Sequence, residues 1–406
     1  MPILPTIPAN GDFSASWRAR AWQRIQSTTT ILIVALVVRL AVAEVFLGHT
    51  PPSWGVNEAA GIARQICAGH GFASPFHDST GPTAWLAPIY PATLACIFRV
   101  FGVETPASTW AAVLLNVIFG SLTAAVVLRL GKKSFGPLAG VIAGWAWAIS
   151  PPVIVMPWYV WETSLSALVM SLALLQTLHL DELAPLRDWI FCGCIWGFAA
   201  LLNPTLLAPL PVLAILAAHR SNHLIRVAMM LVVCALCVTP WTLRNFAAFG
   251  HVVPVRSNFW PEAYFGNVTF DLHPTGPSMA YQQEGEIGFA RELHLRVIEQ
   301  VQSHPGEFVR RTGQRFLTFW TGPAHFGLYA PLLSLAAIAG VVLARRTRHE
   351  WIAFASVLAL YPMIYYVTYT FARYRFPIDP VLYTLSGYLA AEGCSYIQRW
   401  RRGKAA

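Results

Sequence analysis

Two acidic residues lie beside long apolar stretches, where a carboxylate is well suited to take a proton. Glu58 stands at the start of segment 57–66, in which apolar residues recur with helical spacing. Glu162 follows an aromatic run, Trp158–Trp161, and precedes another apolar stretch. A carboxylate partly removed from water has a raised pKa, which favours proton transfer near neutral pH. Each acid also has a simpler interpretation, because a negative charge stabilises any helix N-terminus.

Four arginines also adjoin apolar stretches: Arg244, Arg256, Arg373 and Arg375. The last two are separated by a single aromatic residue, Tyr374. A guanidinium presents a planar fork of donors that matches a phosphate group. The pattern therefore predicts a site for a lipid phosphate or diphosphate. The alternative is anchoring to lipid head groups.

The histidines and cysteines show no convincing metal-ligand spacing, so no metal site is predicted from them. We interpret four histidines as loop residues: His70, His77, His273 and His304. Cys192, Cys194, Cys234 and Cys237 lie in apolar stretches, where cysteine acts as a small hydrophobe. Cys67 and Cys96 share one extramembrane segment and are candidates for a disulfide, although spacing alone does not establish it.

The composition predicts that these residues are positioned by membrane helices. Of 406 residues, 56% are hydrophobic and only 12% are charged, against about 25% charged in soluble domains. The charges cluster between uncharged stretches long enough to cross a bilayer. The 16 tryptophans suit interfacial aromatic belts. The net charge of +9 does not indicate nucleic-acid binding, because the basic residues lie at the ends of the apolar stretches.

The N-terminal apolar run 31–47 resembles a signal peptide, since three arginines precede it and Ala41-Val42-Ala43 lies near its end. However, Arg39 lies within the run and Glu44 follows the apparent cleavage point. We therefore predict an uncleaved first membrane helix. The expected divisions are a cytoplasmic segment 1–30, a membrane domain 31–396 and a basic cytoplasmic tail 397–406.

The uncharged stretches predict an all-α membrane protein of about ten transmembrane helices. Stretch 189–219 is read as two short helices joined at Asn203-Pro204, because proline breaks a helix. The other expected helices are 31–47, 107–128, 136–150, 162–178, 227–241, 326–344, 351–370 and 377–396.

The distribution of basic residues predicts the orientation of these helices. With the N-terminus in the cytoplasm, the clusters 18–24, 129–133, 220–226, 345–348 and 399–404 all fall on the cytoplasmic side. Two long loops, 48–106 and 244–325, then lie outside, as does the link 372–376. Segment 57–66 is expected to lie along the membrane surface with its apolar face down. A site on the extracytoplasmic face of a multi-pass inner-membrane protein is therefore expected.

At these residues the sequence resembles the GT-C glycosyltransferases of family 39, relatives of protein O-mannosyltransferases and of the transferases that add aminoarabinose to lipid A. The resemblance spans about residues 30–396. It rests on Asn57-Glu58 with the following Gly-His-Gly-Phe and Pro-Ile-Tyr-Pro, on Trp161-Glu162, and on three later segments. These are TPWTLRNFAAFGHVVPVRSNFWPEAYFGN at 239–267, His304-Pro305 and ARYRFPIDP at 372–380. This chain departs from the family at two places. Many members have Asp-Glu where it has Asn57-Glu58, and Arg-Pro where it has Asn203-Pro204.

The resemblance implies transfer of a sugar from a polyprenyl phosphate to a lipid, glycan or protein acceptor, with inversion at the anomeric carbon. Glu58 would be the general base, and Glu162 would orient the acceptor or bind a cation. The four arginines would hold the donor phosphate. Supporting residues would be Asn57, Tyr90, Asn245 and Asn258. The resemblance implies no certain cofactor, although a divalent cation is possible; the sugar and acceptor stay open.

Two alternatives belong to other functional classes. The first is a transporter or flippase for lipid-linked glycans. It is less favoured because the two halves show no repeat and ionisable residues are sparse within the expected helices. The second is a membrane protein that binds polyprenyl phosphate without catalysis. The absence of a Gly-rich nucleotide loop favours a lipid-linked donor over a nucleotide sugar.

Overall fold

The computed structural model describes residues 23–49, 57–76, 80–269, 279–322 and 327–403, together with Pro52, Trp54 and Gly55. The side chains of 279–283 and 403 lie outside this description. The described residues form helices, with one isolated β-bridge between Ala73 and Pro82. The all-α fold class is therefore confirmed.

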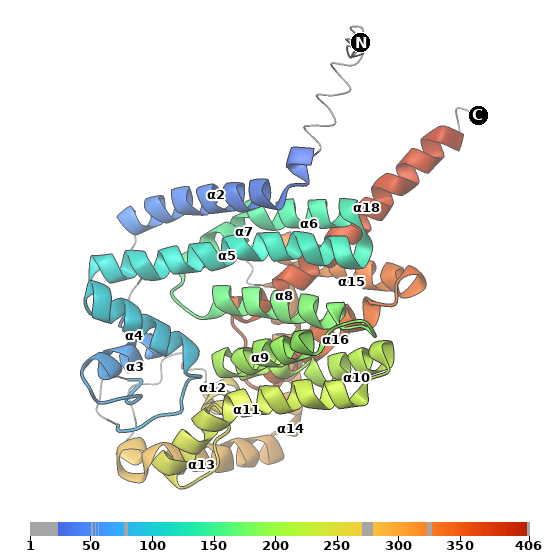
Figure 1. The fold of residues 1–406 in the computed structure, drawn as a ribbon. Coiled ribbons are helices and arrows are strands. Elements are labelled where there is room, and N and C mark those ends of the chain that lie inside the picture. Colours follow the sequence, from blue (N-terminus) through green and yellow to red (C-terminus); the bar gives the residue numbers. More distant parts are fainter. Residues whose placement is uncertain are drawn as a thin grey trace.

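Long helices lie side by side in the body of the molecule (Figure 1). Four described helices are long and apolar enough to cross a membrane: α2 (Thr28–His49), α5 (Pro106–Phe135), α11 (Leu224–Phe249) and α15 (Tyr329–Thr347). The bent pair Pro137–Ile149 and Pro151–Trp158, which comprises α6, α7 (Pro151–Val155) and η1 (Met156–Trp158), would make a fifth span. The expected total of ten spans stays a prediction.

Shorter helices complete the body. They are α8 (Thr163–His179), α9 (Leu186–Leu202), η2 (Pro204–Leu207), α10 (Leu210–Ser221), α16 (Trp351–Leu360), α17 (Met363–Val367), η4 (Ala372–Ile378) and α18 (Asp379–Gly403). Stretch 189–219 is divided at Asn203-Pro204 as predicted. The single helix expected over 351–370 is instead broken at Pro362, because proline has no backbone N–H to continue the helix.

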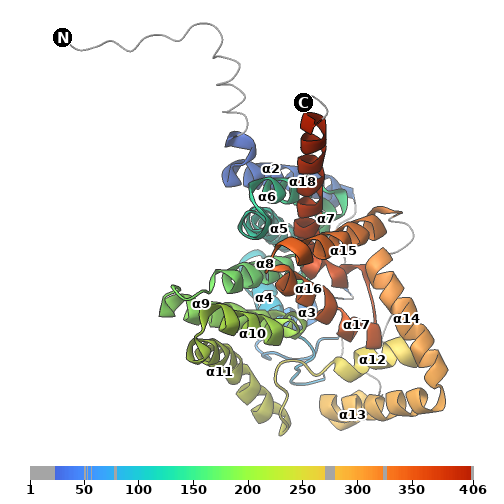
Figure 2. The same cartoon turned by 90° about the vertical axis from the view of Figure 1, so that its right-hand side faces the viewer.

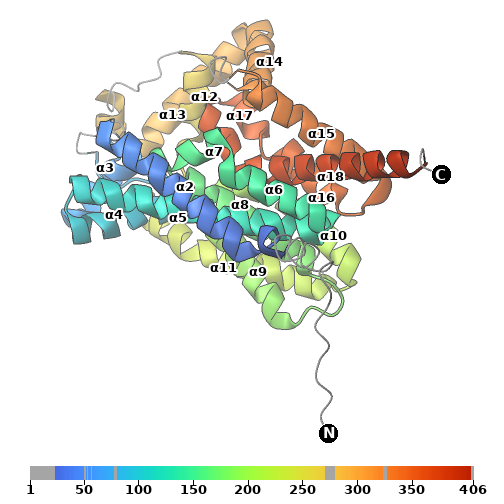
Figure 3. The same ribbon diagram turned by 90° about the horizontal axis from the view of Figure 1, so that it is seen from above.

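Close packing in the body depends on small residues, as is usual for membrane helices. A Cβ atom on Gly131 of α5 would lie 2.6 Å from the Cα atom of Gly140 in α6, so the two backbones touch there. Figure 3 shows α2 across α5 and α6 on the outer side of the body. Trp147, Trp189 and Trp196 are fully buried among these helices.

Arg39 is fully buried in α2 and binds the end of α6. Its Nη1 donates to the carbonyl of Ala148 at 3.0 Å and its Nη2 to that of Trp147 at 2.9 Å. These carbonyls belong to the last turn of α6, which ends before Pro151 and leaves them without helical donors. The apolar N-terminal run is thus an integral part of the fold.

The described parts of the two long loops contain five helices, which lie outside the body. Loop 1 contains α3 (Glu58–Cys67) and α4 (Ile89–Phe101), and loop 2 contains α12 (Phe259–Asn267), α13 (Met279–Ser303) and α14 (Pro305–Thr321). Figure 2 shows α12, α13 and α14 grouped together at one side, with α14 leading toward α15.

The α3 helix forms as predicted, but the expectation that its apolar face is turned to the membrane is wrong. Ala59, Ala60, Ile62 and Ala63 are at most 1% exposed, so the apolar face is buried within the protein. The helix that covers it is α4, which packs against α3. The sequence of α4, Ile89–Phe101, is apolar enough for a buried helix. This helix was not predicted, because residues 48–106 were expected to form a loop.

Candidate active site

A cavity of about 430 Å³ brings together charged residues from loops 1 and 2 and from the helix ends beside them. Three acids line it, Glu58, Glu162 and Glu262, together with two arginines, Arg256 and Arg373. The volume lies within the range of small-molecule sites. Segments more than 300 residues apart in sequence thus meet in one pocket.

Asn57 fixes the start of α3 and hence the position of Glu58. The Asn57 Oδ1 atom accepts a hydrogen bond from the backbone N–H of Ala60 at 3.0 Å, which caps the helix. Its Nδ2 donates to the carbonyl of Val160 at 2.7 Å. Asn57 therefore connects α3 to the segment that carries Glu162.

Burial raises the pKa of Glu58 to about 7. A hydrogen bond from its own backbone N–H opposes this shift, and the negative charge of Glu262 adds to it. The positive charges of Arg373 and Arg256 lower the pKa by smaller amounts. Near neutral pH this carboxyl group can therefore both accept and release a proton.

Glu262 lines the same cavity and was missed by the sequence analysis. It lies in the first turn of α12 and accepts a hydrogen bond from Asn258 Nδ2 at 3.3 Å. Burial raises its pKa, while Arg256 and Arg373 oppose the shift. Glu162 is the residue before α8 and makes no side-chain capping bond there. Two sequence signals pointed to Glu262: its spacing of four from Asn258 and its place in the segment 239–267 that carries the resemblance.

Arg256 and Arg373 lie in the pocket, and neither forms an ion pair with its three acids. The guanidinium of Arg373 lies over the ring of Trp161, 4.0 Å from the centroid. In the part of the chain that the structure describes, the Nε atom of Arg256 is buried without a hydrogen-bond partner. A buried donor of this kind is costly unless a ligand accepts from it.

Arg244 lies outside the pocket and binds the backbone of loop 1. Its Nη1 donates to the carbonyl of Thr83 and its Nη2 to that of Phe72, both at 2.6 Å. Its guanidinium also lies over the rings of Phe72 and Trp241. These contacts use the donors that a phosphate would need.

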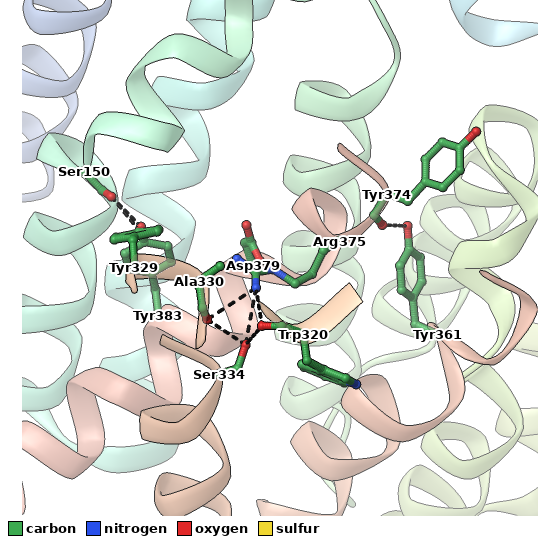
Figure 4. Close-up of polar contacts among 10 residues, drawn as sticks. All are labelled: Ser150, Trp320, Tyr329, Ala330, Ser334, Tyr361, Tyr374, Arg375, Asp379 and Tyr383. Atoms are coloured by element: carbon green, nitrogen blue, oxygen red, sulfur yellow. Dashed lines mark hydrogen bonds and ion pairs between the residues drawn. The ribbon is translucent and has the colours of Figure 1, made fainter. Parts of the chain in front are cut away.

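Arg375 is buried on the other side of η4 from the pocket. Its Nε donates to Asp379 at 2.8 Å and its Nη1 to the carbonyl of Trp320 at 3.1 Å. Figure 4 shows Arg375 and its neighbour Tyr374 pointing in opposite directions. Tyr374 lines the pocket, and its carbonyl accepts from Tyr361 at 3.0 Å.

Two other residues predicted to support the site form hydrogen bonds to the protein itself. The Tyr90 hydroxyl lies 3.5 Å from Asn116 Oδ1 in a buried contact. Asn245 is fully buried, and its Nδ2 donates to the carbonyl of Val253 at 2.9 Å. The structure thus places Asn258 in the pocket, Asn57 at its edge, and Tyr90 and Asn245 away from it.

Part of the pocket lining is apolar. It is formed by Leu86, Ala200, Leu207, Val238 and Ile364. The helix break at Asn203-Pro204 lies between two of these residues in the sequence, because α9 ends at Leu202 and η2 begins at Pro204. Asn203 and Thr205 from the break also line the cavity. Charged and apolar surfaces therefore meet in one site, as an amphipathic ligand requires.

Among the described residues, no group of three His, Cys, Asp or Glu side chains is arranged to hold a metal ion. The seven cysteines are all free thiols, including Cys67 and Cys96. His77 and His273 lie outside the described residues.

Comparison with solved structures identifies the fold. The archaeal oligosaccharyltransferase AglB from Archaeoglobus fulgidus, in complex with an inhibitory peptide and a dolichol-phosphate, matches 96% of the chain with a TM-score of 0.56 and 13% identity. ArnT from Cupriavidus metallidurans matches 87% with a TM-score of 0.52 and 16% identity when bound to undecaprenyl phosphate. Its apo form matches 89% with a TM-score of 0.55 and 17% identity.

The chain therefore has the GT-C fold of these membrane proteins. Residues 85–243 match the family model described as dolichyl-phosphate-mannose-protein mannosyltransferase. A comparison with curated proteins gives no match. The chain covers 52% of AglB and 59% and 60% of the two ArnT structures, so it spans little more than half the length of the solved proteins it resembles.

Proposed function

We propose that this protein is an inverting glycosyltransferase that moves a sugar from a polyprenyl phosphate to a cell-envelope acceptor. The observation that carries the proposal is the pocket itself. Glu58 lines it together with two arginines that form no ion pair with the three acids of the pocket, and apolar residues line it too. The likeness to proteins solved with dolichol-phosphate and undecaprenyl phosphate supports a lipid-linked donor.

In the proposed reaction, Glu58 is the general base. It takes the proton of the acceptor hydroxyl while the acceptor oxygen attacks the anomeric carbon. The bond from that carbon to the phosphate oxygen breaks, and its electron pair leaves with the polyprenyl phosphate. The carboxyl pKa of about 7 suits this step, because a base works best when its pKa is near the working pH.

The leaving phosphate is assigned to Arg256 and Arg373. Negative charge grows on the phosphate as the bond breaks, so donors already in place stabilise the transition state. Arg244 and Arg375 are left out of this role, because their guanidinium groups bind carbonyls and a carboxylate outside the pocket. Glu162 and Glu262 are assigned to orient the acceptor or the sugar, and a divalent cation at these acids stays open.

The polyprenyl chain is assigned to the apolar lining residues Leu207, Val238 and Ile364, since the chain must leave the pocket toward lipid. The pocket is assigned to the extracytoplasmic face. In support, Trp54 bonds Thr109 near the start of α5, at the loop 1 end. Lys132, at the other end of α5, binds the carbonyl of Gln26 in the basic N-terminal region. The positive-inside rule puts that basic end in the cytoplasm.

Purified protein in detergent, mixed with a radiolabelled undecaprenyl-phosphate sugar and an envelope lipid extract, tests the proposal. A transferase releases free undecaprenyl phosphate and labels an acceptor. Release without labelling would indicate hydrolysis instead. Binding without release, or movement of the intact lipid in proteoliposomes, would replace the proposal with the binding protein or the transporter.

A further inference from the structure

Segment 253–258, which carries Arg256 and Asn258, is held on one side by three side chains from the end of α11. Trp241 Nε1 donates to the carbonyl of Val255 at 3.0 Å, and Thr242 Oγ1 to that of Pro254 at 2.9 Å. Asn245 binds the carbonyl before these, at Val253. Three consecutive carbonyls are thus fixed, but all lie before Arg256.

On the other side of Arg256, a buried carboxylate from α13 holds the segment. Glu286 is only 4% exposed, and its Oε1 accepts from the hydroxyl of Ser257 at 2.5 Å and from the N–H of Ala84 at 2.8 Å. Its Oε2 accepts from the hydroxyl of Thr83. The N–H of Ser257 donates to the carbonyl of Ala84 at 2.9 Å. Glu286 therefore joins loops 1 and 2 beside Arg256.

We infer that Glu286 is a positioning residue that holds Arg256 in its phosphate-binding orientation through Ser257. This inference rests on the proposed function and assigns Glu286 no contact with substrate, since Glu286 does not line the pocket. Hydrogen bonds to a buried carboxylate are stronger than neutral ones, so they restrain the segment well. Glu286 also needs these bonds itself, because an unpaired buried charge is costly.

The reason for a restraint at this position is geometric. The Nε atom of Arg256 is buried without a hydrogen-bond partner among the described residues, so no bond to that atom orients the guanidinium. Its direction depends on the backbone at 255–257. Ser257 is the next residue, and its hydroxyl and N–H are both bonded. Loss of Glu286 would remove the bond to the Ser257 hydroxyl, while the Ser257 N–H bond and the α11 contacts would stay in place.

The test is the affinity for undecaprenyl phosphate, without sugar, measured with the full-length protein in micelles. Glu286→Gln keeps the size of the side chain and removes its charge, and we expect the Kd to rise about tenfold. Glu292→Gln is the matched control, because Glu292 is on the same helix and pairs with Arg296 of that helix. It should leave the Kd unchanged.

A double-mutant cycle distinguishes positioning from general damage to the fold. If Glu286 acts through Arg256, then Glu286→Gln changes the Kd less than twofold in the Arg256→Ala protein. Equal effects in both backgrounds would overturn the inference. If Glu286→Gln does not fold, Ser257→Ala replaces it in the same cycle, with the same sign expected and a smaller rise in Kd.

The cycle also separates this inference from the proposed function. If Arg256→Ala weakens binding while Glu286→Gln and Ser257→Ala do not, only the role of Glu286 is lost. If Arg256→Ala leaves the Kd unchanged, both the phosphate site and the positioning role are lost.

Discussion

Replacing Glu58 with glutamine removes the proposed base while preserving its size. A general base contributes about 10²- to 10⁴-fold to a rate. We therefore expect kcat/KM to fall at least about 100-fold, with unchanged expression and thermal stability. Glutamine can still accept the backbone hydrogen bond at the start of α3, so the helix should persist.

The pH profile of the wild-type protein supplies an independent measure of the same group. If Glu58 is the base, only its ionised form is active, and its pKa of about 7 means that kcat/KM should fall as the pH is lowered through 7. From pH 8 to pH 6 the ionised fraction drops about tenfold, whereas an ordinary glutamate with a pKa near 4.3 would change by only a few per cent. The residual activity of Glu58→Gln should not follow this profile.

The assay is transfer of radiolabelled sugar at donor concentrations well below KM, with Glu299→Gln as the control. Glu299 lies on an exposed face of α13, so its replacement should leave kcat/KM unchanged. Wild-type kcat/KM in Glu58→Gln would refute the reasoning. A lost pH dependence in Glu262→Gln, with Glu58→Gln still titrating normally, would move the base to Glu262.

Three other replacements test the roles of single residues. Arg373→Ala should raise the Kd for undecaprenyl phosphate about tenfold at unchanged melting temperature. Arg244→Ala should instead lower the melting temperature, because it leaves two loop 1 carbonyls unpaired. Gly266→Ala should destabilise the protein, since its Cβ would lie 1.8 Å from the carbonyl oxygen of Thr368; thermal unfolding in detergent measures this. Arg39→Met should also lower the melting temperature, and an unchanged value would contradict its role at the end of α6.

The sequence predicted well those helix starts and breaks that depend on residues adjacent in the chain. The break at Asn203-Pro204 follows from the missing N–H of proline, and the α3 helix follows from the spacing of its apolar residues. Its start at Glu58 is fixed by the side chain directly before it, Asn57. Such signals are local, so the sequence contains them in full.

Local sequence patterns did not predict which of the four arginines line the pocket and which bind elsewhere in the protein. Arg244 binds carbonyls that lie 161 and 172 residues away along the chain, and Arg375 binds one that lies 55 residues away. Whether a guanidinium meets a carbonyl or an open pocket depends on tertiary contacts that no local pattern records. The burial of the α3 apolar face under α4 was missed for the same reason.

The proposed reaction links the proton of Glu58 to the charge of the phosphate. When the acceptor is deprotonated, the carboxylate loses a negative charge and the leaving phosphate gains one, so the total charge near Arg256 and Arg373 is unchanged. The product complex therefore contains a neutral Glu58. Binding of undecaprenyl phosphate must then favour protonation of Glu58, and by linkage ionisation of Glu58 must weaken that binding. Measured Kd values should accordingly rise from pH 7 to pH 9 in the wild-type protein and stay constant in Glu58→Gln; equal pH dependence in both would mean that the acid and the phosphate do not share one site.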